Sequence, residues 1–212
     1  MCQLDILRRI ERVKKKILLA LVYMPMLFAA WYYCSPLIAL ITSLVITPLA
    51  GWLTGGLITN VDAIGVLVQG TISVVAGTYG ELVVPAGQTA ELEISARPMV
   101  YGYSIPLFFT LLFAFSTRPI SGRLKVLALL VLLLGISFGT LMELLKTVYF
   151  NLDPTLLPYG RLGSFGSNAL AVGYQLSTLI IPALLPVILW FVLSGRDVLG
   201  HYFAPSSQSV EE

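Results

Sequence analysis

The sequence predicts a membrane α-helical protein with four transmembrane helices and a small antiparallel β-meander inserted between the first two. Three observations predict this fold class. The chain has 212 residues, of which 57% are hydrophobic and only 11% charged, whereas a soluble domain is about 25% charged. Residues 17–61 carry no charge at all. Apolar residues in the segment 62–97 alternate with polar or small ones, which is the period of a half-buried strand.

A basic cluster before the uncharged run orients the first span. The cluster contains Arg8, Arg9, Arg12, Lys14, Lys15 and Lys16. Segments rich in Lys and Arg stay on the cytoplasmic side of a membrane, so residues 1–16 are predicted to be a basic cytoplasmic N-terminus. The apolar run far exceeds the roughly 7–15 residues of a cleaved signal peptide. We therefore predict a retained signal-anchor.

Residues 17–61 are long enough for one crossing or two, since a span needs roughly 20 apolar residues. The loop 118–125 decides between them, because its charged residues are Arg118, Arg123 and Lys125 and it contains no acid. That composition predicts a cytoplasmic loop, which two crossings in residues 17–61 would place outside. We therefore predict a long first helix over 17–61 that crosses once, at about 17–36. Residues 37–58 then stand upright above the membrane or lie along its surface, and the sequence leaves both possibilities open.

The other apolar stretches supply three further spans. Both termini are then cytoplasmic, because four crossings return the chain to the side on which it began. The predicted segments are the second span at 98–117, the basic loop at 118–125, the third span at 126–148, an outer loop at 149–168, the fourth span at 169–194 and a cytoplasmic tail at 195–212.

The segment 62–97 is predicted to be a three-stranded antiparallel meander outside the cytoplasm. The alternation places strands at about 64–76, 81–84 and 89–96. Glycine and proline mark turns at 77–80 and 85–88. So small a sheet needs its apolar face covered, and the segment before it is the natural lid.

Polar residues predicted near the outer ends of the spans form a candidate pocket. Glu143 and Lys146 lie one helical turn apart near the outer end of the third span, and ionisable residues at membrane depth are functional candidates. The alternative is interfacial anchoring, with Lys146 extending outward to the membrane surface among a belt of tyrosines. The pocket would contain Arg97, Glu143, Lys146, Arg161 and Gln175, and the belt Tyr101, Tyr103, Tyr149, Tyr159 and Tyr174.

Small residues recur at four-residue spacing, which places them on one face of a helix and lets membrane helices approach closely. Two interpretations stay open: packing within this bundle, or a docking face for another membrane protein. The residues are Gly51 and Gly55; Gly135 and Gly139; and Ala169, Gly173 and Ser177.

The sequence predicts no catalytic residues, no metal site and no cofactor. Cys34 is expected in the outer half of the membrane or above it, and His201, the single histidine, in the cytoplasm. They would face opposite sides, so they would not form the Cys–His pair of a cysteine peptidase. The positive charge is concentrated near the membrane, which favours lipid headgroups over nucleic acid as a partner.

Four segments resemble the exosortase H-associated membrane proteins. They are residues 97–108 (RPMVYGYSIPLF), 169–190 (ALAVGYQLSTLIIPALLPVILW), 24–31 (MPMLFAAW) and 80–82 (GEL). The resemblance implies a place in the bacterial inner membrane beside an exosortase-like membrane protein. Exosortases are multi-pass, transpeptidase-like enzymes of Gram-negative bacteria that cut a C-terminal sorting tail from exported proteins. They use Cys, Arg and His at the outer membrane face, so this chain resembles the companion and not the enzyme.

The resemblance favours a non-enzymatic accessory protein that binds or stabilises the exosortase or its substrate, through the meander and the small-residue helix faces. The alternative is a membrane enzyme or transport component, which would use the periplasm-facing pocket for an anionic or lipid-linked substrate. A third possibility is a scaffold whose sheet edge accepts a strand from another protein.

Overall fold

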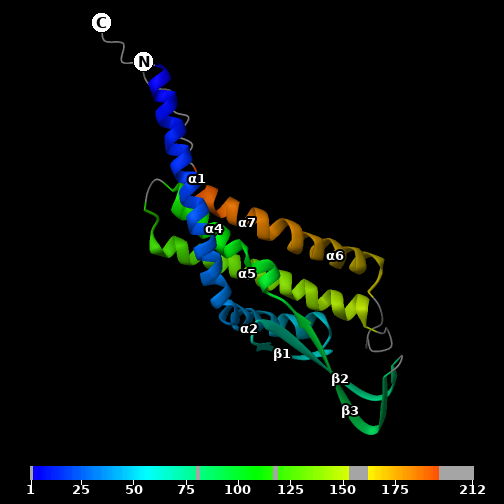
Figure 1. Ribbon diagram of the computed structural model, residues 1–212. Helices are drawn as coiled ribbons and strands as arrows, with labels where there is room; N and C mark the ends of the chain where they lie inside the picture. Colours follow the sequence, from blue (N-terminus) through cyan, green and yellow to red (C-terminus); the bar gives the residue numbers. More distant parts are fainter. Residues whose placement is uncertain (1, 80–81, 117–118, 153–161, 196–212) are drawn as a thin grey trace.

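The structure is a computed structural model that describes residues 2–79, 82–116, 119–152 and 162–195 (Figure 1). Two helices come first, followed by a sheet and then by the remaining helices. The elements are α1 (Cys2–Tyr33), α2 (Ser35–Leu53), β1 (Ile58–Ile64), β2 (Leu67–Tyr79), β3 (Leu82–Ala96), α3 (Met99–Gly102), α4 (Ser104–Phe115), α5 (Gly122–Lys146), the π-helical turn η1 (Thr147–Asn151), α6 (Ser164–Gln175), the π-helical turn η3 (Leu176–Ile180), α7 (Ile181–Trp190) and the π-helical turn η4 (Phe191–Gly195).

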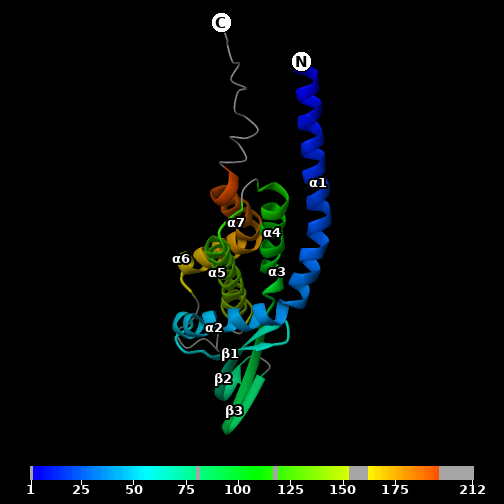
Figure 2. The same ribbon diagram turned by 90° about the vertical axis from the view of Figure 1, so that its left-hand side faces the viewer.

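Apolar helical passes run between two ends of the molecule (Figures 1 and 2). They are α1, α3 with α4, α5 with η1, and α6 through η4. The sheet lies at one end, and the first half of α1, the start of α5 and the end of α7 lie towards the other. The predicted class, a multi-pass helical membrane protein with a small antiparallel sheet, is confirmed. Its orientation in the membrane remains a prediction.

Length and composition alone select a different set of four helices. Four segments are long and apolar enough to cross a membrane: Val13–Tyr33, Ser35–Leu53, Gly122–Asn151 and Ser164–Ser194. The pass made by α3 and α4, Met99–Phe115, is a shorter apolar helix. Length and composition therefore count α2 as a possible membrane span, although α2 lies crosswise to α1 in Figure 2.

The helical stretch expected over residues 17–61 is two helices, a turn and the start of a strand. α1 ends at Tyr33, and α2 begins after Cys34 with Pro36 in its first turn, where a missing N–H costs no helical bond. Gly55 and Gly56, with φ of 62° and 85°, follow the end of α2. Such positive φ angles end a helix and favour glycine. Strand β1 (Ile58–Ile64) was not predicted, because its first residues belong to the uncharged run.

The sheet has the order β1–β2–β3 with both neighbouring pairs antiparallel, so it is the predicted meander. The strand expected at 64–76 corresponds to β2, but the other two expected strands are one long strand, β3. Residues 85–88, where a turn was expected, lie inside β3 but do not pair with β2, because the ladder passes from Val75–Thr89 to Gly77–Val84 and Gly87 has a φ of 81°. Of the turn expected at 77–80, residues 77–79 belong to β2 and pair with β3, and position 80 lies outside the described residues.

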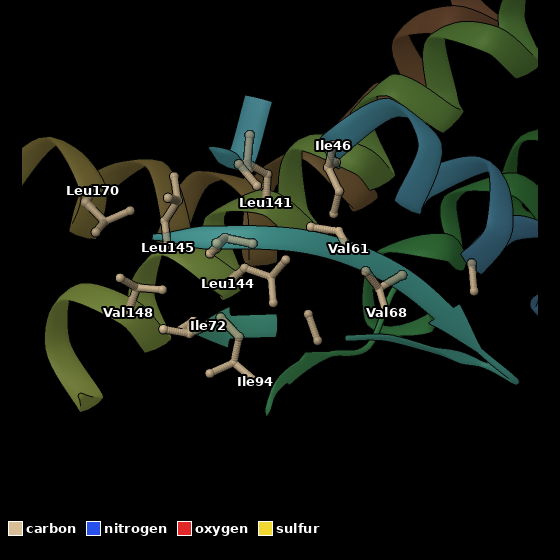
Figure 3. Packing of buried hydrophobic residues seen from close by; sticks show 14 of the residues in the cluster. Ile46, Val61, Val68, Ile72, Ile94, Leu141, Leu144, Leu145, Val148 and Leu170 are labelled. Atoms are coloured by element: carbon tan, nitrogen blue, oxygen red, sulfur yellow. The ribbon is translucent and has the colours of Figure 1, made fainter. Parts of the chain in front are cut away.

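The main hydrophobic core lies between the sheet, α2 and the second half of α5 (Figure 3). Side chains from one face of the sheet meet side chains from both helices. The labelled members are Ile46 from α2; Val61, Val68, Ile72 and Ile94 from the sheet; Leu141, Leu144 and Leu145 from α5; Val148 from η1; and Leu170 from α6. Burying each aliphatic side chain contributes about 1.5–3 kcal/mol to the free energy of unfolding. This cluster therefore holds the sheet and the helices together as one body.

The opposite face of the sheet is polar. In β1, Asp62 pairs with Gln69 of β2, which in turn pairs with Ser95 of β3. The side chains of Asp62, Glu91 and Glu93 are exposed. This alternation of core-facing apolar and outward polar residues is that of a sheet with one face in water.

Candidate functional site

Glu143 lies on α5 where the sheet meets the helices, and two groups donate hydrogen bonds to its carboxylate. The backbone N–H of Arg97 and the hydroxyl of Tyr101 each donate to Oε2 at 3.2 Å. Arg97 follows directly on β3, and Tyr101 belongs to α3. One carboxylate therefore ties the exit of the sheet and the start of the second pass to α5.

Tyr101 is almost fully buried, with 2% of its surface exposed. It packs in one cluster with Ile38 of α2 and Ile136 of α5. A Cβ atom built on Gly139 would lie 2.5 Å from Cδ1 of the Tyr101 ring, so the missing side chain of Gly139 makes room for the ring. A Cβ on Gly102 would similarly lie 2.8 Å from Nε1 of Trp31. The end of α1 and the start of α2, together with α3 and α5, thus meet around Tyr101.

Lys146 turns towards the last pass. Its Nζ lies 4.4 Å from the centroid of the Tyr174 ring on α6, which is the geometry of a cation–π interaction. Gln175, the next residue, is exposed. Lys146 therefore links α5 to α6.

The side chain of Arg97 lies in a different environment. It is exposed, and it lines an open groove of about 530 Å³ together with Val66, Leu67, Met99 and Val100. None of the described acidic side chains forms an ion pair with its guanidinium. Among the residues that the structure describes, the groove thus combines a guanidinium that has no acidic partner with apolar walls.

The structure thus brings only part of the predicted pocket together. The backbone of Arg97 contacts Glu143. Lys146 instead contacts Tyr174, and the side chain of Gln175 is exposed. Arg161 lies outside the described residues. The sequence predicts Tyr101 and Tyr174 only as members of the aromatic belt, although a buried tyrosine hydroxyl usually needs a partner. That need was the available signal that Tyr101 belongs with Glu143.

Three of the small residues pack against other passes of the same chain. A Cβ on Gly135 would lie 3.0 Å from Cδ2 of Leu185, and a Cβ on Gly173 would lie 3.0 Å from Sδ of Met142. Gly139 faces Tyr101 as described. These contacts are the within-bundle packing that was one of the two interpretations.

The other small residues have different surroundings. Gly51 faces the carbonyl oxygen of Ile58 in β1, and Gly55 belongs to the turn after α2, so the two do not form a helix face. Ala169 is exposed, and Ser177 is buried and donates a hydrogen bond to the carbonyl of Tyr174 at 2.9 Å.

The described residues contain no group of three or more His, Cys, Asp or Glu side chains that could hold a metal ion. Cys34 is an exposed free thiol at the joint between α1 and α2. His201 lies outside the described residues, so its predicted separation from Cys34 stays a prediction.

Comparison with known proteins gives one result. The family described as exosortase H-associated membrane protein matches residues 11–197, which is most of the chain. This is the family that the sequence resembles. No curated protein and no solved structure matches the chain.

Proposed function

Because the chain belongs to the exosortase H-associated membrane protein family, we propose that it is an accessory membrane protein of an exosortase-type sorting system. It binds or stabilises the exosortase or its substrate in the bacterial inner membrane, with the sheet in the periplasm. The family match carries this proposal. The structural features below support it and suggest the contact surface.

The polar face of the sheet is the surface we propose for that contact. The hydrophobic core and the Glu143 carboxylate hold the sheet against α5, so its outer face has a fixed position relative to the spans. A pre-ordered surface binds without the cost of ordering itself. Glu91 and Glu93 are exposed on this face, and they give it the negative charge that a basic patch on a partner would recognise.

The glycine faces suit this role less well. Gly135, Gly139 and Gly173 are already covered by side chains of the same chain. Leucine at these positions would disturb packing within the bundle, so a loss of partner binding would not identify a contact surface.

Charge reversal on the sheet tests the proposal. The double variant Glu91→Lys/Glu93→Lys is compared with Glu11→Lys, whose exposed side chain lies on the first half of α1 and whose substitution adds to the positive charge of the basic cluster. Each tagged protein is purified from native membranes in mild detergent, and the exosortase recovered with it is measured. We expect recovery to fall at least tenfold for the sheet variant and to stay within twofold for the α1 variant. Full recovery with both variants, at unchanged thermal stability, would exclude the sheet face as the contact.

The Arg97 groove favours a second candidate function, the binding of an anionic amphiphile such as a phospholipid or a lipid-linked substrate. The guanidinium of Arg97, which has no acidic partner in the described part of the chain, suits a phosphate, and Val66, Met99 and Val100 suit an alkyl chain. Native mass spectrometry of the protein released from nanodiscs containing phosphatidylglycerol measures this binding. We expect Arg97→Gln to lose a lipid adduct that Arg123→Gln, with its exposed side chain at the start of α5, retains. Equal adducts in both variants would remove this candidate.

A further inference from the structure

Helix α2 has an apolar face that no described part of the chain covers. Its buried side faces the sheet and α5 through Ala39, Ile46 and Ala50. The opposite side exposes an unbroken apolar stripe with helical spacing. The stripe consists of Leu37, Leu40, Leu44, Pro48 and Trp52, and the four large side chains in it are between 48% and 79% exposed.

The length and composition of α2 would allow it to cross a bilayer, but its contacts with the sheet do not. The hydroxyl of Thr47, past the middle of α2, donates a hydrogen bond to the carbonyl of Val61 at 3.2 Å. The core extends this contact along α2 from Ala39 to Ala50. The sheet therefore lies beside the helix over most of its length.

A crossing α2 would carry that sheet into the hydrocarbon. The far face of the sheet exposes Asp62, Glu91 and Glu93, and each ionised side chain at membrane depth is costly. β1 and β3 are the edge strands of the sheet, and the backbone groups on their outer edges would also lose water. The sheet must stay in water, so α2 must stay at the membrane surface.

We propose that α2 is an interfacial helix that lies at the sheet-side surface of the membrane, with the stripe from Leu37 to Trp52 in contact with the phospholipids of that leaflet. Three features identify lipid as the occupant. The stripe continues directly from the apolar surface of α1 through the joint at Cys34. It contains no charged or hydrogen-bonding group apart from the Trp52 indole. Trp52 and Tyr33, 79% and 82% exposed, stand near its two ends, where aromatic side chains anchor interfacial segments.

This proposal does not depend on the exosortase partner. It counts only α1, α3 with α4, α5 and the last pass as crossings. The start of α1 and the end of η4 then lie on the same side of the membrane. The long uncharged run after the basic cluster thus contains one span and one surface helix.

Depth measurements by site-directed spin labelling test the proposal. Single labels are placed at Leu37, Leu44 and Trp52 of α2 in a background with Cys2→Ser and Cys34→Ser. The protein is reconstituted alone in phosphatidylcholine–phosphatidylglycerol vesicles, and accessibility to oxygen and to a water-soluble nickel chelate reports depth. The controls are labels at Leu18, Met26 and Tyr33 of α1, which are also exposed. In both helices the outer two labels are separated by about 22 Å of helix.

We expect the three α2 labels to be reached by oxygen and to lie in a shallow band near the headgroups. The α1 labels should spread over most of the available depth. An α2 spread equal to that of α1 would overturn the proposal, because it would show a crossing. Labels on α2 shielded from both reagents would also overturn it, because a second copy of the chain would then cover the stripe. The fluorescence emission of Trp52 in the otherwise native chain is obtained by comparing its spectrum with that of Trp52→Phe. The shift of this emission provides an independent check of the shallow position of Trp52.

Discussion

The carboxylate of Glu143 on α5 accepts a hydrogen bond at 3.2 Å from the backbone N–H of Arg97, 46 positions earlier in the chain. The same oxygen accepts the hydroxyl of Tyr101, so a single acid at the end of the third pass receives two donors from the segment that leaves the sheet. These contacts are those of an anchor between the sheet and the helices. They give the carboxylate at this position a structural role that requires no bound substrate.

Removing this anchor should destabilise the protein. Glu143→Ala leaves the Arg97 N–H and the buried Tyr101 hydroxyl without their acceptor, which costs about 1–3 kcal/mol. Titration with SDS in mixed micelles, followed by tryptophan fluorescence, measures the change in unfolding free energy. Glu143→Gln keeps an acceptor oxygen and should recover at least half of the loss. Glu93→Ala, on the exposed face of the sheet, serves as the control and should change stability by less than about 0.5 kcal/mol. Equal stability of the wild type and Glu143→Ala would contradict the anchor role.

Gly139 and Gly122 form a matched pair on α5. A methyl group on Gly139 would meet the buried Tyr101 ring at 2.5 Å, whereas a methyl group on Gly122 would have no neighbour within 4 Å. Gly139→Ala should therefore cost about 1–3 kcal/mol through overpacking, while Gly122→Ala should be neutral or stabilise by up to about 1 kcal/mol through helix propensity. Thermal unfolding in detergent compares the two. If the variants were equally stable, Tyr101 would not be packed against Gly139.

Much of the fold follows from charge and periodicity. The basic residues before Ile17 and in the loop with Arg123 and Lys125 predicted which apolar runs are separate passes. Period-two alternation predicted the meander. The boundary between α2 and β1 could not be predicted, because residues 53–61 carry no charge and the strand is short. The positive φ angles of Gly55 and Gly56 end the helix there. In the sequence, the four-residue spacing of Gly51 and Gly55 indicated a helix face instead.

The candidate site was less predictable for a physical reason. Sequence spacing relates residues on one helix, as for Glu143 and Lys146, but it does not show which way their side chains turn. Glu143 contacts a backbone N–H, which any residue other than proline at position 97 would provide, so the side chain of Arg97 gave no clue. Lys146 turns to Tyr174 because the last pass lies beside α5, and that placement depends on the whole bundle.

Thr54 joins α2 to the sheet and gives a further prediction. Its hydroxyl donates to the carbonyl of Ala50 at 2.7 Å and accepts the backbone N–H of Ile58 at 3.1 Å, and the residue is buried. Thr54→Ala should lower the unfolding free energy by about 1–2 kcal/mol, since the buried Ile58 N–H loses its partner. Thr54→Ser keeps the hydroxyl and should recover most of the stability. Thr59→Ala, whose hydroxyl makes an exposed bond to the carbonyl of Thr71, is the control and should have a smaller effect. Similar losses for Thr54→Ser and Thr54→Ala would show that the methyl group, and not the hydroxyl, matters.

The proposed orientation predicts which residues a membrane-impermeant reagent can reach. In the background without Cys2 and Cys34, a cysteine replacing Glu93 lies on the exposed face of the sheet, and a cysteine replacing Ser121 lies at the start of α5. We expect the cysteine at position 93 to react with a charged maleimide in spheroplasts whose inner membrane is intact. The cysteine at position 121 should react only after permeabilisation, because the basic loop beside it stays in the cytoplasm. The opposite pattern would invert the topology, and it would place the polar sheet face away from any enzyme site at the outer membrane surface.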